Sequence, residues 1–397
     1  MADLISFEEA QRLVLERAVA LPPEELPLGE AFGRVAAEDA AATVDLPPFA
    51  SSAMDGFAVR AADTPATLPV ALHIAAGAPA PRALEAGEAM GIATGGAVPE
   101  GADAVIPIEY VVQHENSIEI SEPVEHGANV RSAGGDVRRG ERVVAAGMRL
   151  GAAQVGALAA AGVAGVACVR RPRAAVLATG SELRAPGEEL GPGQIYEANT
   201  AILDAQLRSE GAEVERLPAV ADDREAHREA IERGLAADVL LTTGGVSVGP
   251  HDLVRDIERE LGVEEVFWGV SVKPGKPISF GVRGKTLVFG LPGNPVSALV
   301  GFELFVRPAL RALQGIADPL PRWEPGVLAT PVRPNPARDE LVRARTNAEG
   351  SAVSVEPLAG RESHMIARAA GADALALVPR GDGELSAGSP VRFLRLP

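Results

Sequence analysis

Lysine is the scarcest charged residue of this chain. Of 37 basic residues only three are lysines, Lys273, Lys276 and Lys285, and the first two form the segment KPGKP. Because arginine is used everywhere else, two neighbouring lysines suggest a place where a compact ammonium is needed rather than a planar guanidinium. Chance clustering of a rare residue is the alternative explanation.

Cysteine, aromatic residues and long apolar runs are also scarce. The single Cys168 excludes an internal disulfide framework and a thiolate metal cluster, and its apolar neighbours predict a small buried side chain. An aromatic content of 4% predicts cores made mostly of Ala, Val and Leu. The uncharged stretch 151–169 is rich in Ala and Gly and lacks the Leu, Ile and Phe density of a membrane span. The N-terminus has early acids and no basic region, so we expect no signal peptide and a cytoplasmic location.

Length and net charge set two further limits. A chain of 397 residues is too long for one ordinary domain, so we expect roughly two to four. A formal net charge of -17 argues against nucleic acid and against an anionic membrane as partners. If the substrate is an anion, its site must be locally positive within this negative field.

The apolar pattern divides the chain into regions of different texture. A capping box from Ser6 to Glu9 opens an amphipathic helix, and residues 22–141 have the pattern of short strands and turns. Between residues 173 and 313 strand and helix signals alternate, which predicts a doubly wound, mostly parallel sheet. After residue 318 strand signals return and predict a small barrel or sandwich, with one helix starting near Ser363.

End signals set the expected helix boundaries. Asp222 opens a second capping box that ends at Glu225. Asn294 is expected to cap a helix that begins at Pro295 and runs to about Leu313. Other helices are expected over residues 152–161, 199–209 and 251–261.

Three polar loops follow predicted strands of the alternating region. They are TGSE at 179–182, TGGVSVG at 243–249 and LPGNPVS at 291–297. Ligands of parallel sheets bind at the carboxyl ends of strands, where main-chain N–H groups and helix N-termini hold anions. We therefore expect a site for a phosphate or a similar oxyanion, beside KPGKP. Its candidate residues are Thr179, Gly180, Ser181, Gly244, Gly245, Ser247, Pro292, Asn294, Pro295 and Ser297.

Each signal taken singly has a plain structural explanation. Most glycine loops only turn the chain, and Asn294 with Pro295 often only starts a helix. Asp222 fits a helix cap, Asp252 an acid of a first helical turn, and Glu182 a solvated surface acid. No loop has the lysine ending of a phosphate-binding P-loop or the fingerprint of a dinucleotide site. The co-occurrence of the three loops with the lysine pair is what favours a binding site.

A set of motifs spread along nearly the whole chain carries a family resemblance. SSAMDGFAV, IATGGAVPEGADAV, NVRSAGGD, TGSEL, GGVSVG with Asp252, KPGKP and GLPGNPVSA occur in this order. This combination resembles the molybdopterin molybdenumtransferase family, the MoeA proteins and the E domain of gephyrin. The resemblance implies insertion of molybdate into adenylylated molybdopterin, with release of AMP and the help of a divalent cation, usually Mg²⁺.

The resemblance also implies an architecture. Residues 1–45 and 141–172 would form an elongated dimerisation domain, and 46–140 an inserted β-rich domain. Residues 173–318 would form the α/β molybdopterin-binding domain, and 319–397 a small C-terminal β-barrel. The family forms homodimers in which the inserted domain of one subunit completes the active site of the other. Transient contacts with other proteins of molybdenum cofactor biosynthesis are also implied.

Site residues carry over position by position. The positions matching family residues used in substrate binding or turnover are Asp55, Thr94, Asp136, Glu182, Asp222, Asp252 and Lys273. The resemblance implies a molybdate site formed by Lys276, Ser297, Arg343 and Ser363, and a Mg²⁺ held by Glu182, Asp252 and Asp136. From the residues of one chain alone, the turns at Asp55 and Asp136 would have passed as structural. Many members have Gly-Asp-Glu where this chain has Gly180, Ser181 and Glu182, which removes one acid that could bind the metal.

Two other functions use related parts. A molybdopterin adenylyltransferase shares the α/β domain but needs only one domain, whereas this chain predicts four segments. A gephyrin-like scaffold that anchors a protein partner has no need for acids and lysines retained at the strand ends. Both features therefore favour metal insertion.

Overall fold

The computed structural model describes residues 4–75, 77–220, 223–245, 253–349 and 352–396. The chain forms two compact units, which are described separately. The larger unit comprises Met1–Glu24, Gly33–Ala37 and Val169–Pro397, and the smaller one Glu25–Phe32 and Glu38–Cys168. The finer division into four domains stays a prediction. No helix within the described residues is long and apolar enough to cross a membrane.

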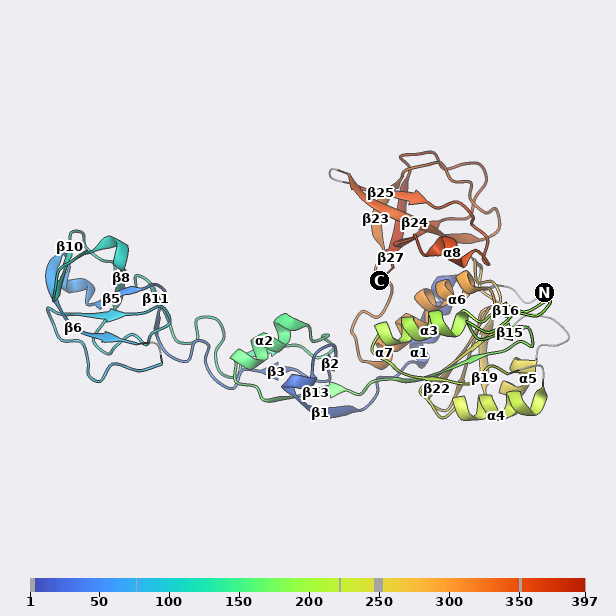
Figure 1. The fold of residues 1–397 in the computed structure, drawn as a ribbon, viewed down its shortest axis with the longest axis horizontal. Coiled ribbons are helices and arrows are strands. Elements are labelled where there is room, and N and C mark those ends of the chain that lie inside the picture. The colour runs from blue at the N-terminus through green and yellow to red at the C-terminus, as the bar shows by residue number, and fades with distance from the viewer. Residues whose placement is uncertain (1–3, 76, 221–222, 246–252, 350–351, 397) are drawn as a thin grey trace. The chain divides into compact units, whose positions relative to one another are not determined.

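A six-stranded sheet forms the centre of the larger unit (Figure 1). Its strands, in spatial order, are β17 (Glu213–Arg216), β14 (Arg173–Ala178), β18 (Val239–Thr243), β22 (Thr286–Leu291), β21 (Ser279–Arg283) and β19 (Glu264–Trp268). The first four are mutually parallel, whereas β21 and β19 are antiparallel. The predicted doubly wound, mostly parallel sheet is confirmed.

Helices cover both faces of this sheet because side chains alternate along each strand. Ala174 and Val176 of β14 face the core shared with α1, α3, α6 and α7, whereas Ala175 and Leu177 face α4 and α5. The bounds of these helices are α1 (Phe7–Arg17), α3 (Asn199–Ser209), α4 (Arg224–Gly234), α5 (Leu253–Glu260), α6 (Pro295–Gly301) and α7 (Arg307–Leu313).

The caps of α1 and α4 test the predicted end signals. The Ser6 hydroxyl accepts a hydrogen bond from the backbone N–H of Glu9 at 3.1 Å, as predicted for an N-cap. For α4 the prediction is wrong by one residue, because Asp223 is the N-cap and accepts from the N–H of Ala226 at 2.8 Å. Two adjacent aspartates satisfy the same sequence pattern, and only backbone geometry decides between them. Asp222 itself lies outside the described residues.

The long helix predicted from Pro295 to about Leu313 contains a π-helical segment, Phe302–Val306, between α6 and α7. Pro308 has no N–H to donate to the carbonyl of Leu304, four residues earlier. That carbonyl instead accepts from Nε2 of Gln11 in α1 at 2.9 Å. The irregular turn thus has an identifiable cause and ties α1 to the α/β layer.

The C-terminal residues form a closed barrel, as expected. Its strands are β23 (Glu324–Leu328), β24 (Asp339–Glu349), β25 (Ala352–Pro357), β26 (Ala374–Val378) and β27 (Pro390–Arg395). They pair in the order β24-β25-β23-β27-β26, and β26 pairs again with β24 to close the ring. A short strand from the α/β region, β20 (Val272–Lys273), adds to β24 in parallel. The predicted helix near Ser363 is α8 (Ile366–Ala369).

The smaller unit is mostly β structure, as predicted. Its six-stranded sheet consists of β8 (Ala104–Pro107), β5 (Gly56–Val59), β7 (Ala89–Ile92), β6 (Ala66–Ile74), β10 (Ser117–Ile120) and β9 (Val112–Gln113). Two-stranded ribbons pair β11 (Val130–Arg131) with β4 (Ser51–Ser52) and β12 (Arg142–Val144) with β3 (Ala40–Ala41). The helix expected at 152–161 is α2 (Ala152–Ala160).

Short elements complete the chain. A three-stranded sheet orders β1 (Pro23–Pro27), β13 (Gly165–Val169) and β2 (Val35–Ala36). In the larger unit, β15 (Leu183–Arg184) pairs with β16 (Ile195–Tyr196). The single-turn 3-10 helices are η1 (Leu28–Glu30), η2 (Ala61–Asp63) and η3 (Ile108–Tyr110).

Candidate active site

The three predicted loops start from the same edge of the α/β sheet. Ala178 of β14 pairs in register with Thr243 of β18, which pairs in register with Leu291 of β22. All three strands are parallel, so the residues that follow them, Thr179, Gly244 and Pro292, leave the sheet side by side. The starts of the three loops therefore meet at the carboxyl edge, as expected.

Hydrogen bonds join the bases of these loops. The N–H of Thr179 donates to the carbonyl of Thr243 at 3.0 Å, and the N–H of Gly244 donates to the carbonyl of Leu291 at 3.3 Å. Asn199, the first residue of α3, donates from Nδ2 to the Thr243 hydroxyl at 2.7 Å and to the Gly293 carbonyl at 2.8 Å. The loops are therefore held as one assembly.

Two glycines of the central loop are required by its geometry. Gly244 has a φ of +86°, and a Cβ added there would lie 2.5 Å from the carbonyl oxygen of Thr179. Gly245 has a φ of +64°, and its added Cβ would lie 2.8 Å from Cγ2 of Val254. A side chain at either position would be strained in the backbone and crowded by its neighbours. This loop thus does more than turn the chain, because its backbone packs closely against β14 and α5.

Glu182 folds back against its own loop. Gly180 has a φ of +149°, and a Cβ added there would lie 2.5 Å from a carboxylate oxygen of Glu182. Glycine therefore leaves the space that this carboxylate occupies, while Ser181 and Glu182 are exposed. No group of three or more His, Cys, Asp or Glu among the described residues could hold a metal ion. Asp222, Ser247 and Asp252 were expected here and lie outside the described residues.

The loop after β22 leads directly into α6. Pro292 is buried, and Asn294 takes the N-cap position without making a side-chain capping bond. Pro295 begins the helix as predicted, and Ser297 in the first turn is 3% exposed. The N–H of Val296 donates to the carbonyl of Ser363 at 3.1 Å, which docks a loop of the C-terminal barrel onto this helix start.

The lysine pair lies at the same edge. Ser279, the first residue of the antiparallel β21, pairs with Gly290 near the carboxyl end of β22, so the preceding KPGKP segment reaches this edge. Nζ of Lys273 lies 3.2 Å from Oε1 of Glu340, a buried carboxylate that also binds Arg361. Lys276 is exposed, and no described carboxylate forms an ion pair with it.

The guanidinium N–H groups of Arg343 form hydrogen bonds within the barrel. The residue is 3% exposed, and its guanidinium donates to the carbonyls of Gly360, Glu362 and Met365, which shapes the loop that carries Ser363. Burial lowers the pKa of Arg343 from its ordinary value, against the opposing charge of Glu362. A direct contact of Arg343 with molybdate stays a prediction.

Sequence reasoning missed Asn199, Glu340 and Arg361. Asn199 stood at the start of an expected helix, where a polar residue needs no further explanation. Arg361 lies two residues before Ser363, but its pairing with Glu340 depends on how the barrel closes.

Three expected site residues belong to the smaller unit. Thr94 donates from its N–H at 2.7 Å and from its hydroxyl at 3.0 Å to one carboxylate oxygen of Asp55. These hydrogen bonds, the one from the N–H first, lower the pKa of Asp55 and keep it ionised. Asp136 is exposed in a turn, where its N–H donates to the carbonyl of Leu46 at 2.9 Å. Their meeting with Glu182 and Lys276 stays a prediction.

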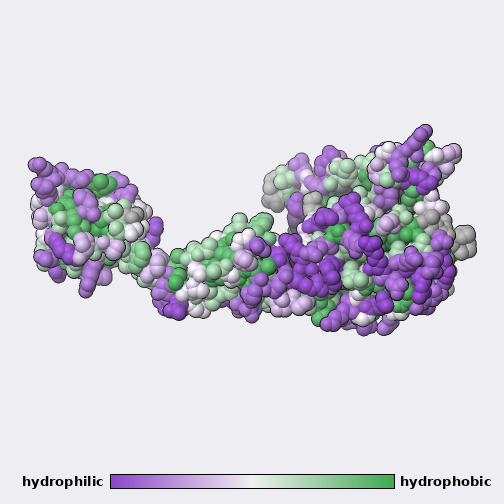
Figure 2. Space-filling view, turned by 60° about the horizontal axis from the view of Figure 1, so that its bottom comes forward, coloured by the Kyte–Doolittle hydropathy of each residue, from purple (hydrophilic) through white to green (hydrophobic). Residues whose placement is uncertain are grey.

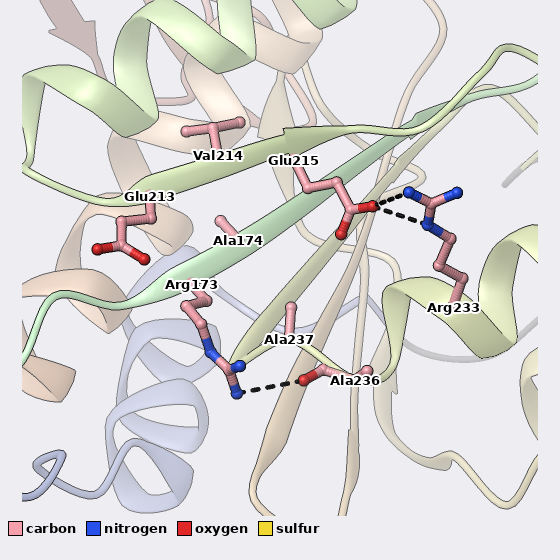
Figure 3. Close-up of a pocket in the computed structure, with 8 residues that line it drawn as sticks. All are labelled: Arg173, Ala174, Glu213, Val214, Glu215, Arg233, Ala236 and Ala237. Atoms are coloured by element: carbon pink, nitrogen blue, oxygen red, sulfur yellow. Dashed lines mark hydrogen bonds and ion pairs between the residues drawn. The ribbon is translucent and has the colours of Figure 1, made fainter.

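The amino edge of the sheet holds a cavity of about 280 Å³ (Figure 3). Ala174, Val214 and Ala237 line it together with the charged side chains of Arg173, Glu213, Glu215 and Arg233. Arg233 pairs with Glu215, and Arg173 donates to the carbonyl of Ala236 at 3.4 Å. This cavity lies at the edge opposite to the three loops.

A doubly wound sheet with clustered glycine loops and a lysine pair at its carboxyl edge defines a class of proteins that bind anionic small molecules. Three family models match the chain. They are the MoeA N-terminal region (domain I and II) at residues 5–162, a probable molybdopterin binding domain at 175–312, and the MoeA C-terminal region (domain IV) at 325–396. The chain belongs to the MoeA family.

Relatives match over the full length. Molybdopterin molybdenumtransferase 2 of Mycobacterium tuberculosis is 37% identical over 403 residues, covering 98% of both chains. Molybdopterin molybdenumtransferase of Staphylococcus epidermidis is 31% identical over 395 residues, covering 98% of this chain and 94% of the relative. A crystal structure of a molybdopterin biosynthesis MoeA protein from Pyrococcus horikoshii has a TM-score of 0.83 at 33% identity and covers 99% of both chains.

Proposed function

We propose that this protein is a molybdopterin molybdenumtransferase that inserts molybdate into adenylylated molybdopterin and releases AMP. The observation that carries the proposal is the register of Ala178, Thr243 and Leu291, which brings the starts of three loops to the sheet edge that the lysine pair reaches. The full-length relatives bearing this name support it.

The main-chain groups of the glycine loops would hold the phosphate part of the substrate. Backbone N–H groups at fixed positions stabilise developing charge without reorganising, which is how such sites lower a barrier. The N–H groups of Thr179 and Gly244 join the loop bases, so these groups would come from the loop residues that follow them and from the start of α6. A protein nucleophile is not needed, because the reaction depends on bringing two anions together.

Positive charge must offset the repulsion between molybdate and the nucleotide. Lys276 is exposed at this edge. The carboxylate of Glu340, in the barrel, forms ion pairs with both Lys273 and Arg361 and so holds these two cations together. Lys276 with Ser297, Arg343 and Ser363 would bind molybdate. Asp55, kept ionised by Thr94, would act on the pterin side from the second subunit of a dimer.

Magnesium fits the oxygen donors present. Mg²⁺ uses one or two carboxylates and keeps several waters, so the space that Gly180 leaves for the Glu182 carboxylate suits a partial ligand set. We propose Glu182, Asp252 and Asp136 as its ligands. Bound there, the ion would neutralise charge on the leaving AMP.

The proposal includes a homodimer. Helix α2 has no charged residue and leaves Ala152, Ala153, Ala157, Ala159 and Ala160 exposed, and apolar surface gathers over its segment in Figure 2. Phe49, Met54 and Tyr110 of the same unit are exposed as well. Light scattering should give twice the chain mass of 40.9 kDa, and a monomer would contradict this part. The cytoplasmic location and contacts with other biosynthetic proteins stay predictions.

The direct test mixes the purified protein with adenylylated molybdopterin, molybdate and Mg²⁺. We expect AMP release that depends on molybdate and stops when Mg²⁺ is chelated. The product should then activate an apo-molybdoenzyme. Consumption of ATP by the protein with unadenylylated molybdopterin would instead indicate an adenylyltransferase.

A further inference from the structure

We propose that Asn199 is a positioning residue that clamps the carboxyl end of β18 to the loop after β22 and so sets the anion-binding geometry of the site. The proposal extends the proposed function, on which its kinetic part rests. Its structural part stands on hydrogen bonds alone.

The amide of Asn199 is suited to this position. The residue is 8% exposed, and Nδ2 donates both to Oγ1 of Thr243 at 2.7 Å and to the carbonyl of Gly293 at 2.8 Å. Oγ1 of Thr243 lies in turn 3.4 Å from the carbonyl of Pro292. One nitrogen with two N–H groups thus connects the end of β18 to the loop after β22, whereas a carboxylate would turn lone pairs toward a carbonyl.

Among the described residues, the other links between these segments are longer hydrogen bonds, from the N–H of Gly244 to the Leu291 carbonyl at 3.3 Å and from Oγ1 of Thr243 to the Pro292 carbonyl at 3.4 Å. Both Gly244 and Gly293 lack side chains, and a Cβ added at Gly293 would lie 3.7 Å from Cα of Gly244. The backbones therefore touch without interlocking. Because N–H groups bind an anion well only when they are aimed in advance, a clamp between the loops controls affinity.

Helix α3 gives the clamp a rigid base. Leu203 and Leu207, one and two turns after Asn199, are fully buried in the core under the sheet. The packing of α3 against the sheet therefore sets the position of the amide. Through this amide, α3 also fixes the position of the segments that it bonds.

The same helix offers a matched control. Gln206 also carries an amide that donates across α3, to the carbonyl of Leu299 at 3.4 Å and to Oε1 of Glu303 at 2.8 Å. Its contacts reach α6 and the π-helical segment, away from the three loops. Truncating Gln206 removes a comparable pair of hydrogen bonds without touching the clamp.

Hydrogen exchange tests the clamp without substrate. In Asn199→Ala the amide proton of Gly244, which donates to the Leu291 carbonyl, should exchange at least about tenfold faster than in the wild type and in Gln206→Ala. Thr243→Val should give the same acceleration, and the double variant no more than either single one. Unchanged exchange in both single variants would overturn the clamp. Thr243→Val also serves if Asn199→Ala fails to fold.

Kinetics test what the clamp does. In the AMP-release assay, Asn199→Ala should raise KM for adenylylated molybdopterin about tenfold with a smaller fall in kcat, and Asn199→Asp should raise it at least as much. Gln206→Ala should keep KM within about twofold of the wild-type value, at a thermal stability equal to that of Asn199→Ala. Faster exchange with unchanged KM would overturn the positioning role. Faster exchange in a protein whose wild type releases no AMP would leave the clamp standing and reject the proposed function.

Discussion

The two edges of the α/β sheet are built from the same strands but use their polar groups in opposite ways. At the amino edge, charged side chains pair with each other, as Arg170 does with Asp238 and Arg233 with Glu215. At the carboxyl edge, the loop bases are joined by backbone groups and one amide, and Lys276 has no described ion-pair partner. The amino edge also holds a cavity of about 280 Å³, lined in part by the paired side chains of Arg233 and Glu215. The two edges therefore differ in how their polar groups are used.

The largest expected effect compares one glycine at each edge. Gly244 and Gly262 have nearly equal φ values of +86° and +84°, but only at Gly244 would a Cβ meet a neighbour within 4 Å. A side chain in this region costs about 1–2 kcal/mol at either position. Gly244→Ala must in addition displace the loop, and a shift near 1 Å at a reacting site costs about 100-fold in rate.

We therefore expect AMP release by Gly244→Ala to fall at least about 100-fold, while Gly262→Ala keeps its rate and loses only stability. Rates and thermal midpoints of the two purified variants provide the measurement. Equal rates in both variants would show that the carboxyl edge has no special geometric demand.

The next comparison uses two of the three lysines. Lys276 lies at the carboxyl edge, whereas Lys285 is exposed in the turn before β22, at the amino edge. A hydrogen bond to a charged group contributes about 1.5–3 kcal/mol, so Lys276→Ala should lose about 10- to 100-fold in kcat/KM for molybdate. Lys285→Ala should lose nothing. Initial rates over a series of molybdate concentrations give kcat/KM for each variant. A wild-type kcat/KM in Lys276→Ala would show that this ammonium does not bind molybdate.

Sequence patterns predicted the carboxyl edge well because the rules there are local. A strand followed by Gly244 and Gly245 predicts a candidate anion site at the strand end, and Pro295 after Asn294 marks a helix start. The parallel order of strands then placed the loops together without any knowledge of side-chain contacts. These features depend on a few neighbouring residues and on one general rule of sheet topology.

The parts that sequence could not provide depend on distant contacts. Asn199 became visible only when α3 was placed against two loops some 44 and 94 residues further along the chain. Arg343 was assigned to an anion by resemblance, and its neighbours in sequence gave no sign that its guanidinium also donates to the carbonyls of Gly360, Glu362 and Met365. The choice between Asp222 and Asp223 as the cap was likewise a matter of backbone angles. The ion pairs of the amino edge correspond to no motif in the sequence.

The smallest effect concerns the amino edge and should appear only in stability. Burial by itself raises the pKa of Asp238, but hydrogen bonds from Arg170 and from the N–H of Arg173 outweigh it and lower that pKa. A lowered carboxyl pKa stabilises the folded state above the unfolded value of about 3.9, and this contribution is lost as pH falls through the folded pKa.

Asp238→Asn should therefore cost about 2 kcal/mol of unfolding free energy near neutral pH, with less difference below about pH 4 and unchanged AMP release. Glu215→Gln, which breaks an exposed pair, should cost under about 0.5 kcal/mol. Urea unfolding over a pH series measures both, and a loss of turnover in Asp238→Asn with normal stability would mean that the amino edge takes part in function after all.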